Sequence, residues 1–254
     1  MPSRFAFVIP LALLLGCGGE PSGPAPLRVA AASDLQEALP ILAARFALDT
    51  GIKVEPVFGS SGQLAQQIKA GAPFDVFLTA NRTYVDDLAK SGEIRPDSVA
   101  TYTRGSLVMV VNNLYDPGIK TLADLADKKV TLISIANPDF APYGVAAKQA
   151  IERAGLWETV KPKIVTAETV RQALQTVQTG NAEVGLVGRA ISGGKGIRTI
   201  PLPPDVCDPI LQGMGIIAET KQPEAAAKFA EFLIGETGQG MLKQFGFLSI
   251  PPGP

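Results

Sequence analysis

Serine side chains stand at two places where a predicted β-strand ends and a helical pattern begins. Ser33 directly follows the apolar run 27–32, and Ser60 and Ser61 follow the run 53–58 within the stretch GSSG. The first turn of a helix presents backbone N–H groups without intrahelical acceptors and about half a unit of positive charge. Hydroxyls and N–H groups that meet there can donate to an oxyanion, and such a site needs neither Lys nor Arg.

Four helix starts of this kind can be located in the sequence. A Gln follows Ser33 by three residues, the spacing of a capping box, so the sequence predicts Ser33 as the N-cap of a helix over 34–48. A second helix is expected to begin at the GSSG serines, a third in NPDFAPYG (137–144), and a fourth after Thr166 or Thr169. Taken singly, each Ser or Thr needs no role beyond capping its helix, so a binding site requires that they converge.

The absence of histidine limits the chemistry open to this chain. Its 254 residues include no His, and its formal net charge is −1. This composition excludes Ser-His-Asp and Cys-His nucleophile systems and the usual zinc sites. It also lacks the basic patch that a nucleic-acid partner requires. An enzyme built on this sequence would depend on carboxylates, Lys or Tyr.

A Ser-dependent hydrolase is the main catalytic alternative. GSSG resembles part of a nucleophile elbow around Ser61, but Gln63 stands where the second Gly of that motif is required. Lys69 lies about two turns further along the same predicted helix, too far away to remove a proton from Ser61. Asp75 with Asp86 and Asp87 could indicate a metal site, yet the position of Asp86 and Asp87 on an exposed helix face favours simple solvation.

Short apolar runs alternate with helical patterns in two successive sets, which is typical of an α/β protein with parallel strands. The first set predicts the first part of lobe 1 over 27–105, and the second predicts lobe 2 over 106–199. Residues 200–254 are expected to return to lobe 1 as a strand and two C-terminal helices. A cleft between the lobes would lie beyond the carboxyl ends of the strands, where helix N-termini point.

The N-terminus is predicted to be a lipoprotein signal segment over 1–17. Arg4 is followed by the apolar run FAFVIPLALLL, too short to span a bilayer, and then by LLGC ending at Cys17, which resembles a lipobox. Lipid on Cys17 would anchor the mature protein, and an ordinary secretory signal is the alternative. The Gly/Pro-rich segment 18–26 is expected to be a flexible tether. The second cysteine, Cys207, is expected to be a small buried apolar residue.

Four stretches of the chain are distinctive in sequence and in order. They are AAASDLQEAL, FGSSGQLAQQIKAGAPFDVFLTA, NPDFAPYGVAAKQAIERAGLWETVKPKIVTAETVRQAL and FAEFLIGETGQGMLKQFGF. Together they resemble the molybdate-binding receptors of ABC-type importers. The second stretch is the most specific, because a hydroxyl pair and a helix precede AGAPFDVF. The resemblance covers most of the chain and implies a type II periplasmic-binding-protein fold, with two α/β lobes that are each a mainly parallel sheet flanked by helices.

The resemblance also implies a site. In that family a tetrahedral oxyanion is held between the lobes, and the matching positions here are the hydroxyls of Ser33 and Ser61 and the main-chain N–H groups of Tyr143 and Val170. Molybdenum would enter only as the centre of bound molybdate, through the same residues, with no further cofactor. Many members carry a Tyr at the position of Gly188. Water, a backbone N–H or Tyr143 from the facing lobe is expected to replace that donor.

The implied function is an extracytoplasmic receptor that binds molybdate or tungstate and delivers it to an ABC permease in the inner membrane. The protein is expected to be a periplasmic or cell-surface lipoprotein and a monomer. It is expected to bind no nucleic acid and to catalyse no reaction. Receptors for sulfate or a phosphonate, and the hydrolase described above, are the alternatives.

Four further residues carry structural expectations. Asp34 is expected to stabilise the first turn of its helix, with its carboxylate turned away from the anion. Arg171 and Arg189 are expected to be solvated cations or to bridge the two lobes. Asn81 is expected to cap the helix that begins at Arg82.

Overall fold

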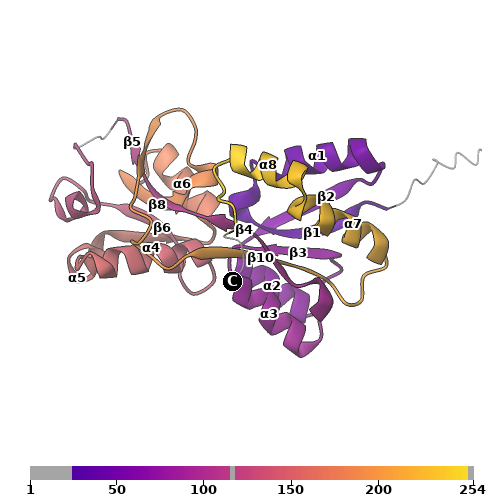
Figure 1. Cartoon of the computed structure of the whole chain (residues 1–254). Helices are drawn as coiled ribbons and strands as arrows, with labels where there is room; N and C mark the ends of the chain where they lie inside the picture. Colours follow the sequence, from indigo (N-terminus) through magenta and orange to yellow (C-terminus); the bar gives the residue numbers. More distant parts are fainter. Residues whose placement is uncertain (1–24, 115–117, 251–254) are drawn as a thin grey trace, which may run out of the picture.

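The structure, a computed structural model, describes residues 25–114 and 118–250 and arranges them in two lobes (Figure 1). The predicted signal segment with Cys17, and the tether up to residue 24, lie outside the described residues. Among the residues that are described, no helix has the length and apolar character needed to cross a bilayer.

Lobe 1 is built on a five-stranded sheet with the order β2-β1-β3-β10-β4. β1 pairs in parallel with β2 and β3, whereas β10 runs antiparallel to β3 and β4. Successive residues of β1 point to opposite faces, so that Val29 and Ala30 belong to two different apolar clusters. The strands are β1 (Leu27–Ala32), β2 (Val54–Gly59), β3 (Val76–Thr79), β4 (Ala100–Gly105) and β10 (Ile210–Ile216).

Helices cover both faces of the lobe 1 sheet (Figure 1). On one face α1, α7 and α8 share an apolar cluster, in which the rings of Phe46 and Phe229 meet edge to face with centroids 5.1 Å apart. On the other face α2 and α3 bury Leu64 and Val85 against Phe77. The helices are α1 (Leu39–Thr50), α2 (Ser61–Lys69), α3 (Arg82–Ser91), α7 (Pro223–Ile234) and α8 (Glu236–Gln244).

Lobe 2 contains the second five-stranded sheet, with the order β7-β6-β8-β5-β9. β6 is parallel to β7 and β8, and β5 is antiparallel to β8 and β9. Every residue of β5 is buried, as expected for a strand covered on both faces. The elements are β5 (Leu107–Asn112), β6 (Ile133–Ala136), β7 (Ile164–Ala167), β8 (Val184–Gly188), β9 (Ile197–Pro201), α4 (Pro142–Arg153), α5 (Trp157–Val160) and α6 (Val170–Gln178).

The described chain passes between the lobes at two places. Ser106 alone separates the end of β4 from the start of β5, and residues 202–209 connect β9 to β10. Most of each apolar core lies within one lobe, although Ala32 and Ala80 of lobe 1 also pack against the lobe 2 cluster. Two short crossings between the lobes allow hinge motion that leaves most of each core in place.

The predicted fold class is confirmed: the chain forms two α/β lobes with the type II periplasmic-binding-protein architecture. Sequence periodicity did not predict β4 and β9. Both lie at the edges of their sheets, and their sequences, ATYTRG and IRTIP, mix polar and apolar residues. Edge strands tolerate polar residues and proline, so their periodic signal is weak.

The prediction that Ser33 caps a long helix is wrong. Residues Ser33–Leu35 form a short 3₁₀ helix, η1, whose N-cap position is Ala32, and α1 begins only at Leu39. Pro40 lies in the first turn of α1, where its missing N–H costs no intrahelical hydrogen bond. The physical reason is therefore that proline starts this helix rather than interrupting it.

Candidate oxyanion-binding site

The four residues implied by the resemblance line one cavity between the lobes. Lobe 1 contributes Ser33 and Ser61, and lobe 2 contributes Tyr143 and Val170. All four are buried, and the cavity between them is small, with a volume of about 10 Å³. None of its lining residues is Lys or Arg.

The two serine hydroxyls are available as donors for different reasons. Ser33 Oγ makes no hydrogen bond to any residue that the structure describes. Ser61 Oγ accepts a hydrogen bond from the N–H of Ala80 at 3.0 Å, which leaves its own hydrogen free to donate. Ser60 is the N-cap residue of α2 and donates its hydroxyl to Gln63 Oε1 at 3.0 Å. Ser61 is therefore the serine of this pair that can serve the cavity.

Two helices of lobe 2 begin at the cavity. Tyr143 is the second residue of α4 and Val170 the first of α6, so their N–H groups belong to first turns, where no intrahelical acceptor exists. Thr169 caps α6 in a capping box with Gln172, as the sequence predicts for one of its two candidates. The positive ends of both helices therefore add favourable potential for an anion.

The lobes touch each other directly beside the cavity. The N–H of Gly62, in the first turn of α2, donates to the carbonyl oxygen of Phe140 in lobe 2 at 2.8 Å. Gln63 Nε2 donates to Glu168 Oε1 at 2.8 Å, also between the lobes. These contacts define a closed arrangement in which the cavity is enclosed by both lobes.

Arg171 bridges the lobes, one of the two roles expected for it. Its guanidinium contacts Glu37 Oε1 at 2.7 Å, and both side chains are partly exposed to solvent. Arg189 does not line the cavity. Neither cation therefore supplies charge at the site.

Asp34 is the middle residue of the 3₁₀ helix η1, and the long helix it was expected to stabilise does not exist. Its side chain is fully buried, the residue lines the cavity, and Oδ2 accepts a hydrogen bond from Nε2 of Gln212 on β10. Burial raises its pKa to about 6, against the opposing effect of hydrogen bonds with Gln212 and Tyr143. A buried carboxylate that lines the cavity was not predicted from the sequence, which placed Asp34 with its carboxylate turned away from the anion.

Gly188 faces the ring of Tyr143. A Cβ added at Gly188 would lie 2.9 Å from Cζ of Tyr143, and one added at Gly105 would lie 2.1 Å from its hydroxyl oxygen. Both glycines are therefore needed to accommodate this ring at the crossing between the lobes. Tyr143 belongs to the same lobe as Gly188, so the expectation that it reaches over from the facing lobe is wrong.

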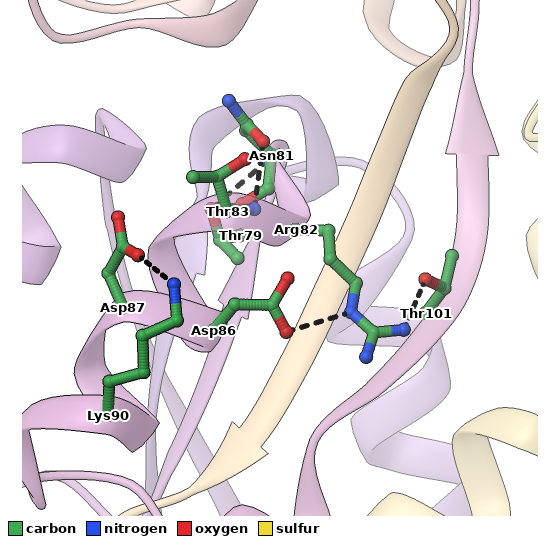
Figure 2. Close-up of polar contacts among 8 residues, drawn as sticks. All are labelled: Thr79, Asn81, Arg82, Thr83, Asp86, Asp87, Lys90 and Thr101. Carbon is green, nitrogen blue, oxygen red and sulfur yellow. Dashed lines mark hydrogen bonds and ion pairs between the residues drawn. The ribbon is translucent and has the colours of Figure 1, made fainter.

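The aspartates of α3 do not form a metal site. Figure 2 shows that Asp86 turns toward Arg82, with 3.2 Å between Oδ1 and Nε, while Asp87 turns toward Lys90, with 3.0 Å between Oδ1 and Nζ. The two carboxylates thus make separate exposed ion pairs. Across the described part of the chain, no group of three potential metal-binding side chains is found.

Asn81 caps α3 as predicted. Its Oδ1 accepts a hydrogen bond from the N–H of Thr83 at 3.0 Å, and its carbonyl oxygen accepts one from Thr79 Oγ1 at 3.1 Å (Figure 2). The N-cap role therefore accounts for Asn81.

The Ser-Lys alternative finds no support in the geometry. Ser61 is the first residue of α2 and Lys69 the last, which separates them by about 12 Å along the helix axis. Ser61 is buried, whereas Lys69 is exposed. A proton cannot pass directly between these side chains.

Comparison with known proteins agrees with the geometry. Residues 27–248 match the family model described as bacterial extracellular solute-binding protein. The chain belongs to this family. The solute-binding proteins similar to it include the molybdate-binding protein ModA of Azotobacter vinelandii, 35% identical, covering 92% of this chain and 93% of that protein. ModA of Rhodobacter capsulatus is 33% identical, with 94% of each chain covered.

A solved structure of this solute-binding family shares the fold throughout. The periplasmic molybdate-binding protein of Azotobacter vinelandii superposes with a TM-score of 0.82 at 30% identity, covering 89% of this chain and all of that one. The family members named here are solute receptors of the periplasm or cell exterior rather than enzymes.

Two features of the site were not recognised from the sequence. The contact of Gly62 with Phe140, which requires glycine at this position for the two lobes to meet, was not predicted. Asp34, Gln212 and Tyr102 form a buried polar network whose members lie far apart in the chain. The sequence feature that could have indicated this network is Gln212, a polar residue within the otherwise apolar run of β10.

Proposed function

We propose that this solute-binding protein is a receptor for molybdate, with tungstate as an equivalent ligand, and that it delivers the oxyanion to an ABC permease. The observation that carries the proposal is a small cavity between two lobes, lined by hydroxyl and N–H donors and by no cationic side chain, with the buried Asp34 as its one carboxylate. The identity to ModA proteins over most of the chain supports molybdate as the ligand.

Four donors are enough for the expected affinity. The hydroxyls of Ser33 and Ser61 and the N–H groups of Tyr143 and Val170 approach the cavity from both lobes. A hydrogen bond to a charged group contributes about 1.5–3 kcal/mol, and micromolar to nanomolar binding corresponds to about 8–12 kcal/mol. The four bonds therefore account for much of the binding free energy, and helix dipoles add to them.

Neutral donors favour selectivity by size and protonation state. An Arg in the site would attract sulfate, phosphate and molybdate alike, whereas fixed donors in a small enclosed cavity reward the anion whose oxygens reach all of them. A receptor for sulfate or a phosphonate is the alternative function, and it predicts a different order of affinities.

Closure of the lobes would be the signal that the permease recognises. The contact between Gly62 and Phe140 and the ion pair between Arg171 and Glu37 exist only when the lobes meet. The receptor would thus bind without making or breaking covalent bonds, and it would need no cofactor. Lipid on Cys17 would hold it as a monomer beside the membrane, with 18–26 as the tether.

A thermal-shift panel of molybdate, tungstate, sulfate and phosphate tests this function, followed by calorimetry on Ser33→Ala. Molybdate and tungstate should stabilise the protein by about 2.7 kcal/mol at 100 times their dissociation constants. Ser33→Ala should weaken molybdate binding about 10- to 150-fold, because one charge-assisted hydrogen bond is lost.

Ser134→Ala is the matched control for the Ser33 variant. Ser134 is fully buried in β6, outside the cavity, and its hydroxyl has no hydrogen-bond partner among the described residues. Its removal should leave molybdate affinity unchanged. Preferential stabilisation by sulfate or phosphate would contradict the molybdate assignment.

A further inference from the structure

A carboxylate lies beside the proposed anion site in a fully buried position. Asp34 is 0% exposed, follows Ser33 in the chain, and lines the same cavity. Oδ2 accepts a hydrogen bond from Gln212, but Oδ1 has no hydrogen-bond partner among the residues that the structure describes. Burying an ionised oxygen without a partner is costly, so this position disfavours the charged form of Asp34.

The titratable groups packed against Asp34 are two tyrosines. Tyr102, from β4, donates its hydroxyl to Gln212 Oε1 at 2.8 Å. The hydroxyl oxygen of Tyr143, from α4, accepts from Gln212 Nε2 at 3.4 Å. Burial, together with the charge of Asp34, raises both tyrosine pKa values well above their usual range. Both hydroxyls therefore remain neutral and supply no positive charge to balance an ionised Asp34.

The cations on the elements packed against η1 do not line the cavity. From α6, Arg171 pairs with Glu37 at 2.7 Å, and η5 (Arg189–Ile191), which packs beside η1, carries Arg189 outside the cavity. β2 contributes Gly59 to the cavity wall, and glycine has no charged side chain. The groups that act on the pKa of Asp34 are its own N–H, Gln212 and Tyr143, and burial outweighs them.

The environment of Asp34 depends on closure of the lobes. Gln212 and Tyr102 belong to lobe 1 with Asp34, whereas Tyr143 belongs to lobe 2. The pKa of about 6 therefore describes the carboxyl with the lobes closed, where burial outweighs the hydrogen bonds of Gln212 and Tyr143 that lower it. A dianion in the same cavity disfavours the ionised form further, because like charges repel at short range.

We propose that Asp34 takes up one proton from solvent when the oxyanion binds and the lobes close. The closed site then holds a dianion next to a neutral carboxylic acid, and opening releases both the anion and the proton. No bond of the ligand changes, and the proton moves only between solvent and the carboxyl oxygen. This inference rests on the proposed function, because it requires an oxyanion in the cavity.

The direction of the pH dependence follows from linkage. Binding that takes up a proton strengthens as pH falls, between the pKa of Asp34 in the free protein and its higher value in the complex. Molybdate remains a dianion above pH 6, so the ligand itself adds no proton in this range. The chain contains no His that could supply the same behaviour.

Calorimetry of molybdate binding to the wild-type protein tests the proposal without relying on a variant. Titrations at pH 7 in two buffers that differ in ionisation enthalpy give the number of protons taken up. We expect fractional proton uptake at pH 7 that increases toward one proton per oxyanion when the titration is repeated at pH 6, and an affinity that falls as pH rises by at most about tenfold per pH unit.

Asp34→Asn identifies the residue responsible, because Asn preserves the shape and can still accept from Gln212. This variant should bind molybdate with no proton uptake and with an affinity independent of pH. Asp49→Asn, at an exposed carboxylate paired with Arg45 on α1, should retain the wild-type proton uptake.

The possible results separate this proposal from the proposed function. Molybdate binding without proton uptake and with a flat pH profile in the wild type would overturn the role of Asp34 and leave the receptor function intact. Uptake that persists in Asp34→Asn would also overturn it. Absence of molybdate binding at every pH would remove the proposed function, and this inference with it.

Discussion

Gly62→Ala tests whether closure of the lobes determines affinity. An added Cβ would lie 2.8 Å from the carbonyl oxygen of Phe140 and 2.9 Å from the hydroxyl of Tyr84. The tyrosine side chain can turn away, but the carbonyl belongs to the backbone of the opposite lobe and also accepts the Gly62 N–H at 2.8 Å. The conflict therefore exists only when the lobes are closed.

The expected magnitude follows from these contacts. Overpacking of this kind costs about 1–3 kcal/mol, which corresponds to about a 5- to 150-fold loss of affinity when the cost falls on the closed state alone. Ala in place of Gly favours the helix by about 0.5–1 kcal/mol in both states. The variant should therefore bind molybdate more weakly while the ligand-free protein melts at an equal or higher temperature.

Calorimetry and thermal melting of the ligand-free protein measure these two effects. Gly240→Ala is the matched control, because Gly240 lies within α8 and a Cβ there would meet no atom within 4 Å. It should stabilise the protein without changing affinity. Wild-type molybdate affinity in Gly62→Ala would refute the reasoning that closure and binding are coupled through this contact.

Two further substitutions probe the site and the contact between the lobes. Ser61→Ala should weaken molybdate binding and also lower the melting temperature of the ligand-free protein, because the buried N–H of Ala80 loses its acceptor at a cost of about 1–3 kcal/mol; an unchanged melting temperature would contradict this hydrogen bond. Arg171→Ala should reduce affinity by no more than about fivefold, and 1 M salt should abolish the difference, since the Glu37 pair is partly exposed and exposed pairs contribute about 1 kcal/mol or less. A loss that persists at high salt would place Arg171 in the site itself.

Much of the fold could be predicted because lobe interiors impose simple periodicity. The fully buried run of β5 and the apolar positions of α1, which recur at helical spacing through Leu42 and Phe46, identify their elements locally. The edge strands β4 and β9 have mixed sequences, and only pairing with β10 and β5 defines them. A capping-box spacing was misleading at Ser33, because the spacing does not reveal that Pro40 would set the helix start.

The location of the candidate site could be predicted from helix starts, but its contacts between the lobes could not. The helix starts at the GSSG serines and at Thr169 follow from the rule that strand ends and helix N-termini meet at one edge of a sheet, whereas Val170 was assigned through the family resemblance. The contact of Gly62 with Phe140 and the burial of Asp34 depend on how one lobe meets the other. Residues of the two lobes are far apart in the sequence, so local patterns contain no record of that geometry.

The most direct test of the central claim is a crystal structure of the protein with molybdate, with the metal located by its anomalous scattering. The neutral-donor account predicts a single oxyanion between the lobes, its oxygens within hydrogen-bond distance of the Ser33 and Ser61 hydroxyls and of the Tyr143 and Val170 N–H groups. An anomalous peak outside this cavity, or an anion held there by a Lys or Arg side chain, would contradict it.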